Sequence, residues 1–584
     1  MSATSEAATG GGRAALVRSL LRPYRGRVIA AVAATVTAAL ANLAPPYLAG
    51  LVVDNVVATG STSTLVLVAI GLTFAILAAW AAGTLETWLV GEVGQRALMD
   101  LRERLFAHLE TLPMSYYDRV SAGRILSRVS NDVESLNTLV TGGLNQLVSN
   151  LLLLVGTLVV LMVLDWRLAL VAAFVFPLVA TVSAGFQRLA RPAWRTASDA
   201  LAGVTTYMAE GLSGRAVVRA FGQEDHHLAG FDRRNTRHHV SFVRPIFLNR
   251  TMVPVAELLA AIAIAAVIIY GGREAVGGAL DVGLIVTFTA YLRQALAPLP
   301  QLTTLLGSAQ QASAALDSLD EIFGEAPDPG QLGGRRPAPP LGGDLTFEDL
   351  WFAYEDERWI IRDLSVRIDA GQTVAFVGHS GCGKSTLIKL AFGFYAPQRG
   401  RVRYDGNDLA ELDLPSVRRQ VALVAQEPFL FAGSIAENIA WARPGASAEE
   451  VRAAAAAVHA LEVFERLPHG FDTEVGERGE RLSGGQRQLV SLARAMVTDP
   501  RILVLDEATS SIDVATEARV QRGLEHLLAG RTSLVVAHRL STIRRADHVV
   551  VLEAGRVVEQ GSPSELRKAG GHYARLEAES ERVA

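Results

Sequence analysis

Uncharged apolar stretches recur along the N-terminal half of the chain. Between Arg27 and Asp54 lie 26 residues without a charged side chain. That is enough to cross a hydrocarbon core of about 30 Å. Five further stretches cover residues 65–85, 135–164, 168–187, 252–272 and 282–306. We therefore predict six membrane-spanning helices, of which the fifth carries Glu257 and the sixth Arg293.

The distribution of arginine between the spans predicts their orientation. Arginines precede the first span and fill the second-to-third and fourth-to-fifth connections, whereas residues 54–64 have none and residues 273–281 have only Arg273. Positively charged loops stay in the cytoplasm. We expect a multi-pass protein of the cell (plasma or inner) membrane with both termini cytoplasmic.

The two arginine-rich segments, residues 91–135 and 188–250, are long and contain few glycines. Such segments continue membrane helices into the cytoplasm, where they would reach a distant soluble domain. From Glu325 to Asp344 the chain reads EAPDPGQLGGRRPAPPLGGD, in which proline and glycine leave no room for a regular element. We predict a transmembrane domain over residues 1–325, a linker over 326–343 and a soluble domain over 344–584.

Composition excludes several classes of protein. Of the 584 residues, 50% are hydrophobic and 20% are charged, which is incompatible with disorder. The net charge of −4 does not indicate a nucleic-acid-binding protein. Cys382 is the single cysteine, so an internal disulfide and a cysteine-based zinc site are both excluded.

A phosphate-binding loop follows the apolar run 373–377 and precedes a helical stretch. Strand, glycine-rich loop and helix are the context that such a loop requires. Its backbone N–H groups point at phosphate oxygens, Lys384 would reach the β- and γ-phosphates, and the Ser385 hydroxyl would hold Mg²⁺. Lys384 is one of only three lysines in a chain that otherwise uses arginine. The loop residues are Gly378, His379, Ser380, Gly381, Cys382, Gly383, Lys384, Ser385 and Thr386.

Two acidic residues, Asp506 and Glu507, directly follow a later apolar run, Ile502–Leu505. The run is typical of a buried parallel strand that delivers carboxylates at its C-terminal end. We predict that Asp506 holds the Mg²⁺ shell and that Glu507 polarises the attacking water.

Between these motifs, residues 482–486 read LSGGQ. Here the chain resembles the ATP-binding cassette (ABC) family, whose signature this is. The resemblance implies that the signature binds the γ-phosphate of an ATP held by a second cassette, through Ser483, Gly484, Gly485 and Gln486.

Other family elements match residue by residue. The resemblance implies that Tyr354 stacks on adenine, that Gln426 contacts Mg²⁺ and water, and that His538 contacts the γ-phosphate. Asp513 matches the loop after the acid pair, although Ile512 replaces the usual alanine of that loop.

The resemblance extends over nearly the whole chain. Residues 113–133 and 214–224 look like the two intracellular loops of ABC exporters, and residues 473–479 look like the exporter loop that touches them. It implies an exporter-type half-transporter of the multidrug and lipid exporter group. Its fold would be an all-α six-helix membrane domain with long cytoplasmic helix extensions, followed by an α/β P-loop nucleotide-binding domain.

These features predict an ATPase that drives export or flipping of amphipathic or lipophilic substrates by alternating access. The cofactors would be ATP and Mg²⁺, and the partners the bilayer, a lipophilic or amphipathic small molecule and a second half-transporter, without nucleic acid. Because one chain carries every site residue, a homodimer is favoured over a heterodimer.

Some alternatives stay open. The chain could import a siderophore-like solute on the exporter fold, or act as an ATP-gated channel or regulatory subunit, although an intact Glu507 favours turnover. Cys382 fits either a small filler in the loop or a redox sensor, whose thiol pKa the helix start could lower. Glu257 fits either a functional membrane carboxylate or a position at the interface, because Pro254 lies just before it.

Overall fold

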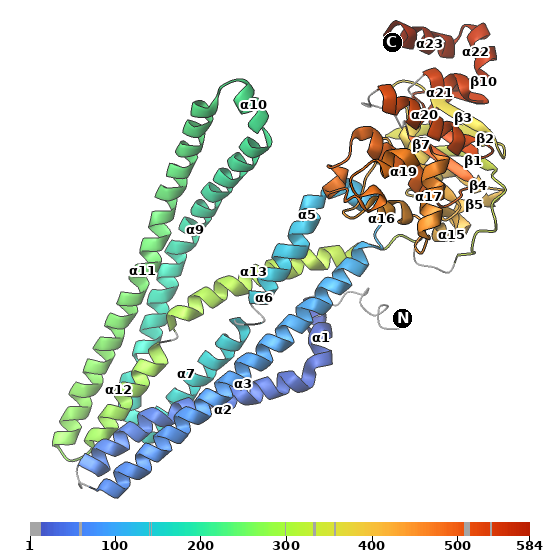
Figure 1. Cartoon of the computed structure of the whole chain (residues 1–584). Coiled ribbons are helices and arrows are strands. Elements are labelled where there is room, and N and C mark those ends of the chain that lie inside the picture. The colour runs from blue at the N-terminus through green and yellow to red at the C-terminus, as the bar shows by residue number, and fades with distance from the viewer. Residues whose placement is uncertain are drawn as a thin grey trace. The chain divides into compact units, whose positions relative to one another are not determined.

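A computed structural model describes residues 13–57, 61–138, 141, 143–297, 299–330, 335–355, 358–506, 514–537 and 540–583. The chain forms two compact units (Figure 1). The first comprises Met1–Leu109 and Ala122–Glu325, and the second Glu110–Ser121 and Ala326–Ala584. A short segment from the N-terminal half thus belongs to the second unit.

The first unit is entirely helical in its described part. Its elements are α1 (Arg13–Leu21), η1 (Arg22–Tyr24), α2 (Arg25–Leu51), η2 (Val52–Val57), α3 (Thr62–Leu109), α5 (Ala122–Ser127), η3 (Arg128–Asp132), α6 (Val133–Thr138), α7 (Leu144–Leu164), α8 (Trp166–Ala173), α9 (Val175–Ser213), α10 (Arg215–Ala220), α11 (Glu224–Val276), α12 (Val282–Leu296) and α13 (Leu299–Gly324). Within the described ranges, five helical segments are long and apolar enough to cross a membrane, and α12 is a shorter apolar helix.

Two predicted spans differ in their limits. The third begins as α7 at Leu144, after the separate helix α6, instead of at residue 135. The sixth is divided between α12 and α13. The chain has prolines at positions 298 and 300, and proline lacks the N–H that a continuous helix needs.

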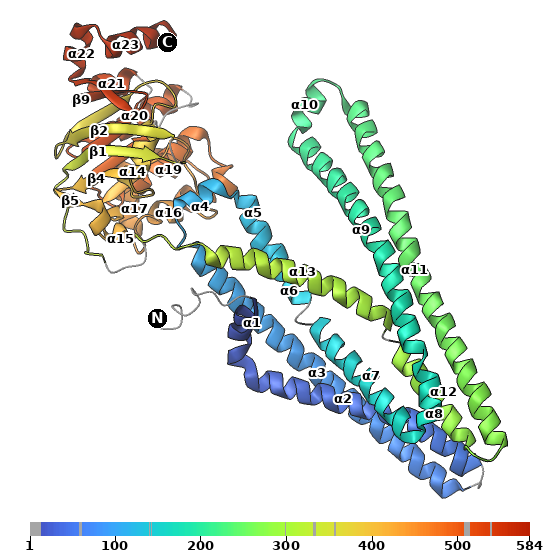
Figure 2. The same cartoon turned by 180° about the vertical axis from the view of Figure 1, so that it is seen from behind.

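The predicted helix extensions are confirmed. Helices α3, α9 and α11 contain 48, 39 and 53 residues. At a rise of about 1.5 Å per residue each is about 58 Å long or longer, roughly twice the thickness of a hydrocarbon core. Helices α9 and α11 lie side by side, and α10 joins them at one end (Figures 1 and 2).

The second unit is built on two sheets. A six-stranded sheet has the order β10-β9-β3-β8-β7-β6 and is parallel except at β10, and a four-stranded antiparallel sheet has the order β2-β1-β4-β5. The strands are β1 (Leu345–Ala353), β2 (Trp359–Ile368), β3 (Thr373–Val377), β4 (Arg399–Tyr404), β5 (Asn407–Asp408), β6 (Val421–Val424), β7 (Ile502–Asp506), β8 (Thr532–Val536), β9 (His548–Glu553) and β10 (Arg556–Gly561).

The helices of this unit are mostly short. They are α4 (Met114–Arg119), α14 (Lys384–Ala391), η5 (Leu409–Glu411), α15 (Leu414–Arg418), α16 (Ile435–Ala440), α17 (Ala448–Ala457), α18 (Leu461–Glu465), η6 (Gly470–Asp472), η7 (Glu477–Gly479), α19 (Gly484–Met496), α20 (Val514–Leu528), α21 (Leu540–Arg545), α22 (Pro563–Ala569) and α23 (His572–Val583).

A hydrophobic core covers each face of the six-stranded sheet. Successive side chains of a strand point to opposite faces. Along β7, Leu503 and Leu505 pack into one core with residues of α19, whereas Ile502 and Val504 pack into the other with β1 and α14. Burial on both faces explains why this strand is an uninterrupted apolar run.

Candidate nucleotide-binding site

The phosphate loop connects β3 to α14 through glycines in conformations that other residues rarely adopt. Gly378 has φ +150° and Gly383 has φ +108°. A Cβ on Gly383 would lie 2.6 Å from Ile361 Cδ1 and 3.3 Å from the Ile360 carbonyl oxygen. The loop therefore needs glycine at position 383 for both conformation and space.

The Lys384 side chain is directed back into this loop. It is only 5% exposed, and Nζ donates to the Gly378 carbonyl at 2.7 Å and to the His379 carbonyl at 3.0 Å. Cys382 Sγ lies 3.8 Å from the same nitrogen and is buried. A cation held among backbone groups at the start of a helix is the arrangement that binds a phosphate chain.

The register of the sheet brings the other predicted residues to the same edge. Val536 of β8 pairs with Phe376 on one side and with Asp506 on the other, so β3 and β7 end level with each other. Gln426 follows β6, which is the next strand beyond β7. Ligands of parallel α/β sheets bind at the carboxyl ends of the strands. The loop, Asp506 and Gln426 therefore share the edge where a nucleotide would bind.

Three predicted residues lie outside the described residues: Glu507, Asp513 and His538. Glu507 directly follows β7 in the chain, and His538 follows β8 after one intervening residue. Their roles stay predictions.

Tyr354 stands beside the first helix of the site. Its hydroxyl lies 3.3 Å from Thr386 Oγ1, and the residue is 44% exposed. It contacts the Tyr395 ring edge-to-face at 5.1 Å. An exposed aromatic face held next to the phosphate loop is suited to stack on a base.

The signature segment forms a capped helix start. The Gln486 backbone N–H donates to Ser483 Oγ at 3.2 Å, and the Ser483 N–H donates to Gln486 Oε1 at 2.8 Å. Ser483 is thereby the N-cap of α19, whose first residues are Gly484 and Gly485. This capping box orients the helix start, whose partial positive charge favours an anion.

The donor set fits Mg²⁺. Ser385 is exposed at the start of α14, and Asp506 and Gln426 supply oxygen atoms at the neighbouring strand ends. Among the described residues, no group of three or more His, Cys, Asp or Glu could hold a metal. Mg²⁺ is commonly held by one or two protein oxygens together with substrate phosphates, so this sparse set suits it.

A contact that the sequence did not predict joins α4 to the helix of the phosphate loop. Lys389 Nζ lies 2.9 Å from Asp118 Oδ2, and the Tyr395 hydroxyl donates to the same oxygen at 2.6 Å. Partial burial would raise the pKa of Asp118, but the hydrogen bonds from Tyr395 and Lys389 outweigh it and lower that pKa. Burial acts to lower the pKa of Lys389, but Asp118 and Tyr354 together outweigh it and raise that pKa. Lys389 is 5.2 Å from the centre of the Tyr354 ring. The sequence carries one signal for this contact: Lys389 is one of only three lysines in a chain that otherwise uses arginine.

An arginine of the signature helix holds a neighbouring segment. Arg494 donates to the Phe429 carbonyl at 2.8 Å and to the Asn438 carbonyl at 2.8 Å. Asn438 in turn bonds the Phe431 backbone N–H and carbonyl. Burial lowers the pKa of Arg494. These bonds connect α19 to an exposed aromatic patch made of Phe429, Phe431 and Trp441.

In the first unit, a buried carboxylate joins three helices. Glu86 on α3 is 7% exposed, and its Oε1 accepts hydrogen bonds from Asn145 Nδ2 and, at 3.0 Å, from Ser149 Oγ. Asn145 Oδ1 also accepts from Thr35 on α2. Glu86 lies directly after the second predicted apolar stretch, which ends at Leu85, and for that reason it is not among the predicted site residues. Glu257, by contrast, is exposed on α11.

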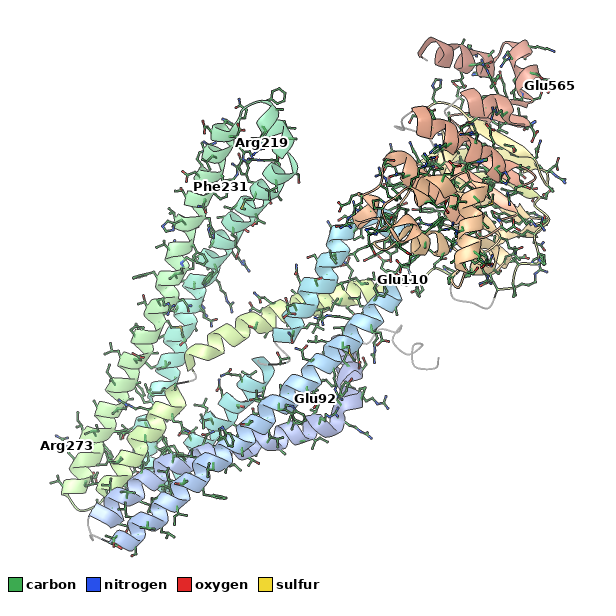
Figure 3. All side chains as sticks on the ribbon, in the orientation of Figure 1. Glu92, Glu110, Arg219, Phe231, Arg273 and Glu565 are labelled. Atoms are coloured by element: carbon green, nitrogen blue, oxygen red, sulfur yellow. The ribbon has the colours of Figure 1, made fainter. Side chains whose placement is uncertain are left out.

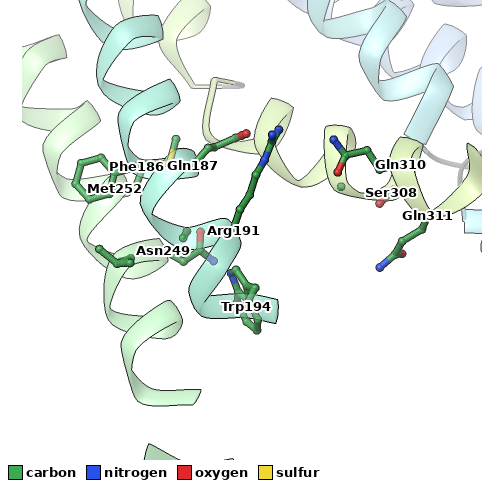
Figure 4. Close-up of a pocket in the computed structure, with 12 residues that line it drawn as sticks. Phe186, Gln187, Arg191, Trp194, Asn249, Met252, Ser308, Gln310 and Gln311 are labelled. Atoms are coloured by element: carbon green, nitrogen blue, oxygen red, sulfur yellow. The ribbon is translucent and has the colours of Figure 1, made fainter. Parts of the chain in front are cut away.

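The first unit also contains a pocket of about 350 Å³ between α9, α11 and α13 (Figure 4). Its walls combine apolar residues such as Trp194 and Met252 with Arg191 and side-chain amides. At opposite ends of the α9–α11 pair lie Arg219 and Arg273 (Figure 3).

A phosphate loop, a strand-end carboxylate and a signature helix on a P-loop fold, joined to span-length helices, define a nucleotide-driven membrane transporter. The comparisons agree with this class. Residues 28–299 match the family model for the ABC transporter transmembrane region, and residues 361–510 match the model named ABC transporter. The chain belongs to the ABC transporter family, as an exporter with ATPase activity coupled to transport.

Relatives and a solved structure match most of the chain. The uncharacterised ABC transporter ATP-binding protein YknV of Bacillus subtilis (strain 168) is 36% identical over 96% of this chain and 93% of its own length. An ATP-dependent lipid A-core flippase of Alkalilimnicola ehrlichii is 39% identical over 84% of this chain and 83% of its own. The structure of a bacterial Atm1-family ABC exporter with ATP bound has a TM-score of 0.80 and 29% identity, covering 95% of this chain and 98% of that one.

Proposed function

We propose that this exporter moves amphipathic or lipophilic substrates, as a transporter or flippase of the cell membrane with both termini in the cytoplasm. The observation that carries the proposal is the pocket between α9, α11 and α13, whose walls are part apolar and part polar. Such mixed walls suit a molecule with one apolar and one polar end. Two relatives that are 39% and 34% identical are named as lipid A-core flippases, so their names give a lipid as the substrate. This supports a lipophilic or amphipathic substrate here.

In this proposal residues 1–325 form the transmembrane domain, 326–343 the linker and 344–584 the nucleotide-binding domain. Lys384 and the loop amides bind the phosphates, and Tyr354 stacks on the adenine. Ser385, Asp506 and Gln426 hold Mg²⁺, which supplies charge neutralisation on the phosphates. Glu507 is the general base for water, with His538 and Asp513 completing the site.

We propose that two identical chains assemble. One chain carries one phosphate loop and one signature, and the family resemblance pairs each loop with the signature of the other subunit. The exposed aromatic patch Phe429–Phe431–Trp441 and the 74% exposed Phe221 beside α10 support this assembly, because each is an apolar surface suited to a partner. The charges of these two surfaces are complementary. Arg215 and Arg219 lie on α10, and the exposed Glu427 and Glu474 lie on the cassette.

A complementation experiment tests the homodimer. A Lys384→Ala chain lacks a working loop, and a Ser483→Arg chain lacks a working signature. Co-expression should restore ATP hydrolysis that neither variant has alone, because a mixed dimer contains one intact loop–signature pair. Inactivity of the mixture, with both chains present in the purified dimer, would contradict pairing between copies.

Transport is tested in proteoliposomes with the cassettes outside. ATP should drive a fluorescent phospholipid or a hydrophobic dye away from the cassette side, and Glu507→Gln should abolish the movement. Movement toward the cassettes would indicate import. An ATP-dependent ion conductance without probe movement would indicate a channel.

A further inference from the structure

The pocket between α9, α11 and α13 has one cationic side chain and a set of amides. Arg191 extends from α9 toward α13, which contributes Gln310 and Gln311 to the lining, and Asn249 lines the pocket from α11 (Figure 4). Amide and guanidinium groups together offer several hydrogen-bond donors to one head group.

Charge within the pocket is of one sign. Among the described residues that line it, none is acidic. Arg191 has no ion-pair partner in the described part of the chain. Arg188 and Arg195 lie three and four residues away on α9, a spacing that puts all three guanidinium groups on one helix face. Arg250 follows Asn249 on α11. A guanidinium that lines a pocket together with side-chain amides, without a carboxylate in the described lining, is an anion site by its chemistry.

The pocket also has an apolar part. Phe186, Trp194, Leu248 and Met252 are the large apolar side chains of its lining. Trp194 is held edge-on against Phe242 of α11, with ring centres 5.4 Å apart. A volume of about 350 Å³ falls within the range of small-molecule pockets.

The position of the pocket follows from the apolar stretches. Its residues lie at or just beyond the end of the stretch 168–187, the start of 252–272 and the end of 282–306. These are the three ends predicted to face the cytoplasm. An amphipathic molecule entering from the inner leaflet would meet the arginine at the polar boundary of the membrane.

We propose that this pocket binds amphipathic organic anions, with a carboxylate, phosphate or sulfonate on Arg191 and the apolar body against Trp194 and Met252. The inference rests on the proposed export of amphipathic substrates and narrows it to anions. Arg191 is the specificity-determining residue, because it is the charged member of the lining.

The test uses two probes that differ in charge alone. Anilinonaphthalene sulfonate is an anion, and N-phenylnaphthylamine is the same scaffold without the sulfonate. Binding of each to the full-length protein in lipid nanodiscs is measured by energy transfer from tryptophan, with empty nanodiscs subtracted, and stimulation of ATP hydrolysis is measured in parallel. The wild-type protein should prefer the sulfonate by about tenfold or more, the size of a charge-assisted hydrogen bond.

Three variants locate the preference. Arg191→Gln should abolish the preference while leaving the neutral probe bound, which shows that the pocket is intact. Arg191→Lys should retain it. Arg195→Gln, the matched control, removes the same charge one turn away and should leave the preference within about threefold, because exposed charges are screened.

Different results would contradict the anion inference and the proposed export of amphipathic substrates. Equal binding of both probes to the wild-type protein, or a preference that survives Arg191→Gln, would overturn the anion inference. If the neutral probe still stimulates ATP hydrolysis in that case, the proposed export of amphipathic molecules stands. Absence of stimulation by every amphipathic compound would instead count against the proposed function.

The anion could be a lipid head group or a diffusible solute, and one further arm separates them. Phosphatidylglycerol added to the nanodiscs should compete with the sulfonate in the wild-type protein more than in Arg191→Gln if a lipid occupies the pocket. An equal effect on both proteins reports only repulsion by the membrane surface, and then assigns the pocket to a soluble anion.

Discussion

Lys389 and Asp118 form an ion pair of 2.9 Å, although 271 positions separate them in the chain. Lys389 lies on α14, whose first residue is the phosphate-loop lysine Lys384. Asp118 lies on α4, in the segment that resembles an exporter intracellular loop. This ion pair therefore joins the helix that would bind the phosphates directly to the segment expected to transmit movement to the membrane helices.

Loss of the Asp118–Lys389 ion pair should weaken the coupling between ATP hydrolysis and the membrane helices. We expect Asp118→Asn to keep ATP binding and basal hydrolysis but to reduce substrate stimulation of hydrolysis several-fold. Both side chains are partly exposed, so the pair contributes only about 0–1 kcal/mol to stability, and the melting temperature should hardly change. Glu462→Gln, which removes an exposed carboxylate 3.5 Å from Arg466, is the matched control. Equal effects of the two substitutions would contradict a coupling role.

The same pair predicts a flat pH dependence. The pKa of Asp118 is lowered from its ordinary value of 3.8, so the contribution of this carboxylate is present above that value and is lost only as pH falls through the lower folded pKa. The pKa of Lys389 is raised from 10.5, so its contribution is lost only as pH rises through the higher folded pKa. The ratio of stimulated to basal hydrolysis in the wild type, relative to Asp118→Asn, should therefore be constant between about pH 5 and 9. A midpoint within that window would contradict the assignment.

The catalytic assignment separates binding from hydrolysis. Glu507→Gln removes the basic oxygen but keeps the size of the side chain, so turnover should fall by about 10²-fold or more while ATP affinity stays unchanged. Lys384→Ala should weaken ATP binding itself, because the buried ammonium is lost. Both are measured by nucleotide binding and steady-state phosphate release. Hydrolysis near the wild-type rate in Glu507→Gln would mean that the base is elsewhere.

Two loop glycines offer a matched comparison. Gly381 and Gly383 both have positive φ, +82° and +108°, but a Cβ on Gly381 meets nothing within 4 Å, whereas one on Gly383 meets Ile361. Backbone strain of about 1–3 kcal/mol applies to both. We expect Gly383→Ala to lower the melting temperature more than Gly381→Ala. Equal shifts would show that conformation alone, and not space, decides the need for glycine.

The buried carboxylate of α3 should matter for stability. Glu86→Leu leaves Asn145 and Ser149 without their acceptor inside the helix bundle. Hydrogen bonds between membrane helices contribute about 0.6 kcal/mol each, and up to about 1.7 kcal/mol, so the thermal unfolding temperature in lipid should fall measurably. Glu257→Leu changes an exposed glutamate and should not lower it. The reverse order of effects would contradict a structural role for Glu86.

Local motifs explain what could be predicted. A run such as residues 373–377 followed by the glycine loop can form only a buried strand, a tight turn and a helix, because apolar content and glycine conformation act over a few residues. The same holds for β7 and Asp506, and for the apolar stretches. The assignments of Glu507, Asp513 and His538 rest on the resemblance and lie outside the described residues.

By itself, then, the sequence determined the approximate positions of the apolar helices and the order of strand, glycine loop and helix at the phosphate loop, since each depends on neighbours in the chain. It did not determine where the third span begins or that the sixth is divided. Only the tertiary structure decided that Asp118 forms an ion pair with Lys389 and that Glu86 accepts a hydrogen bond from Asn145. It also decided that Arg191 lines one pocket with amide side chains of α11 and α13. These contacts join residues far apart in the chain. Their distances depend on how whole helices pack, which no local pattern of residues specifies.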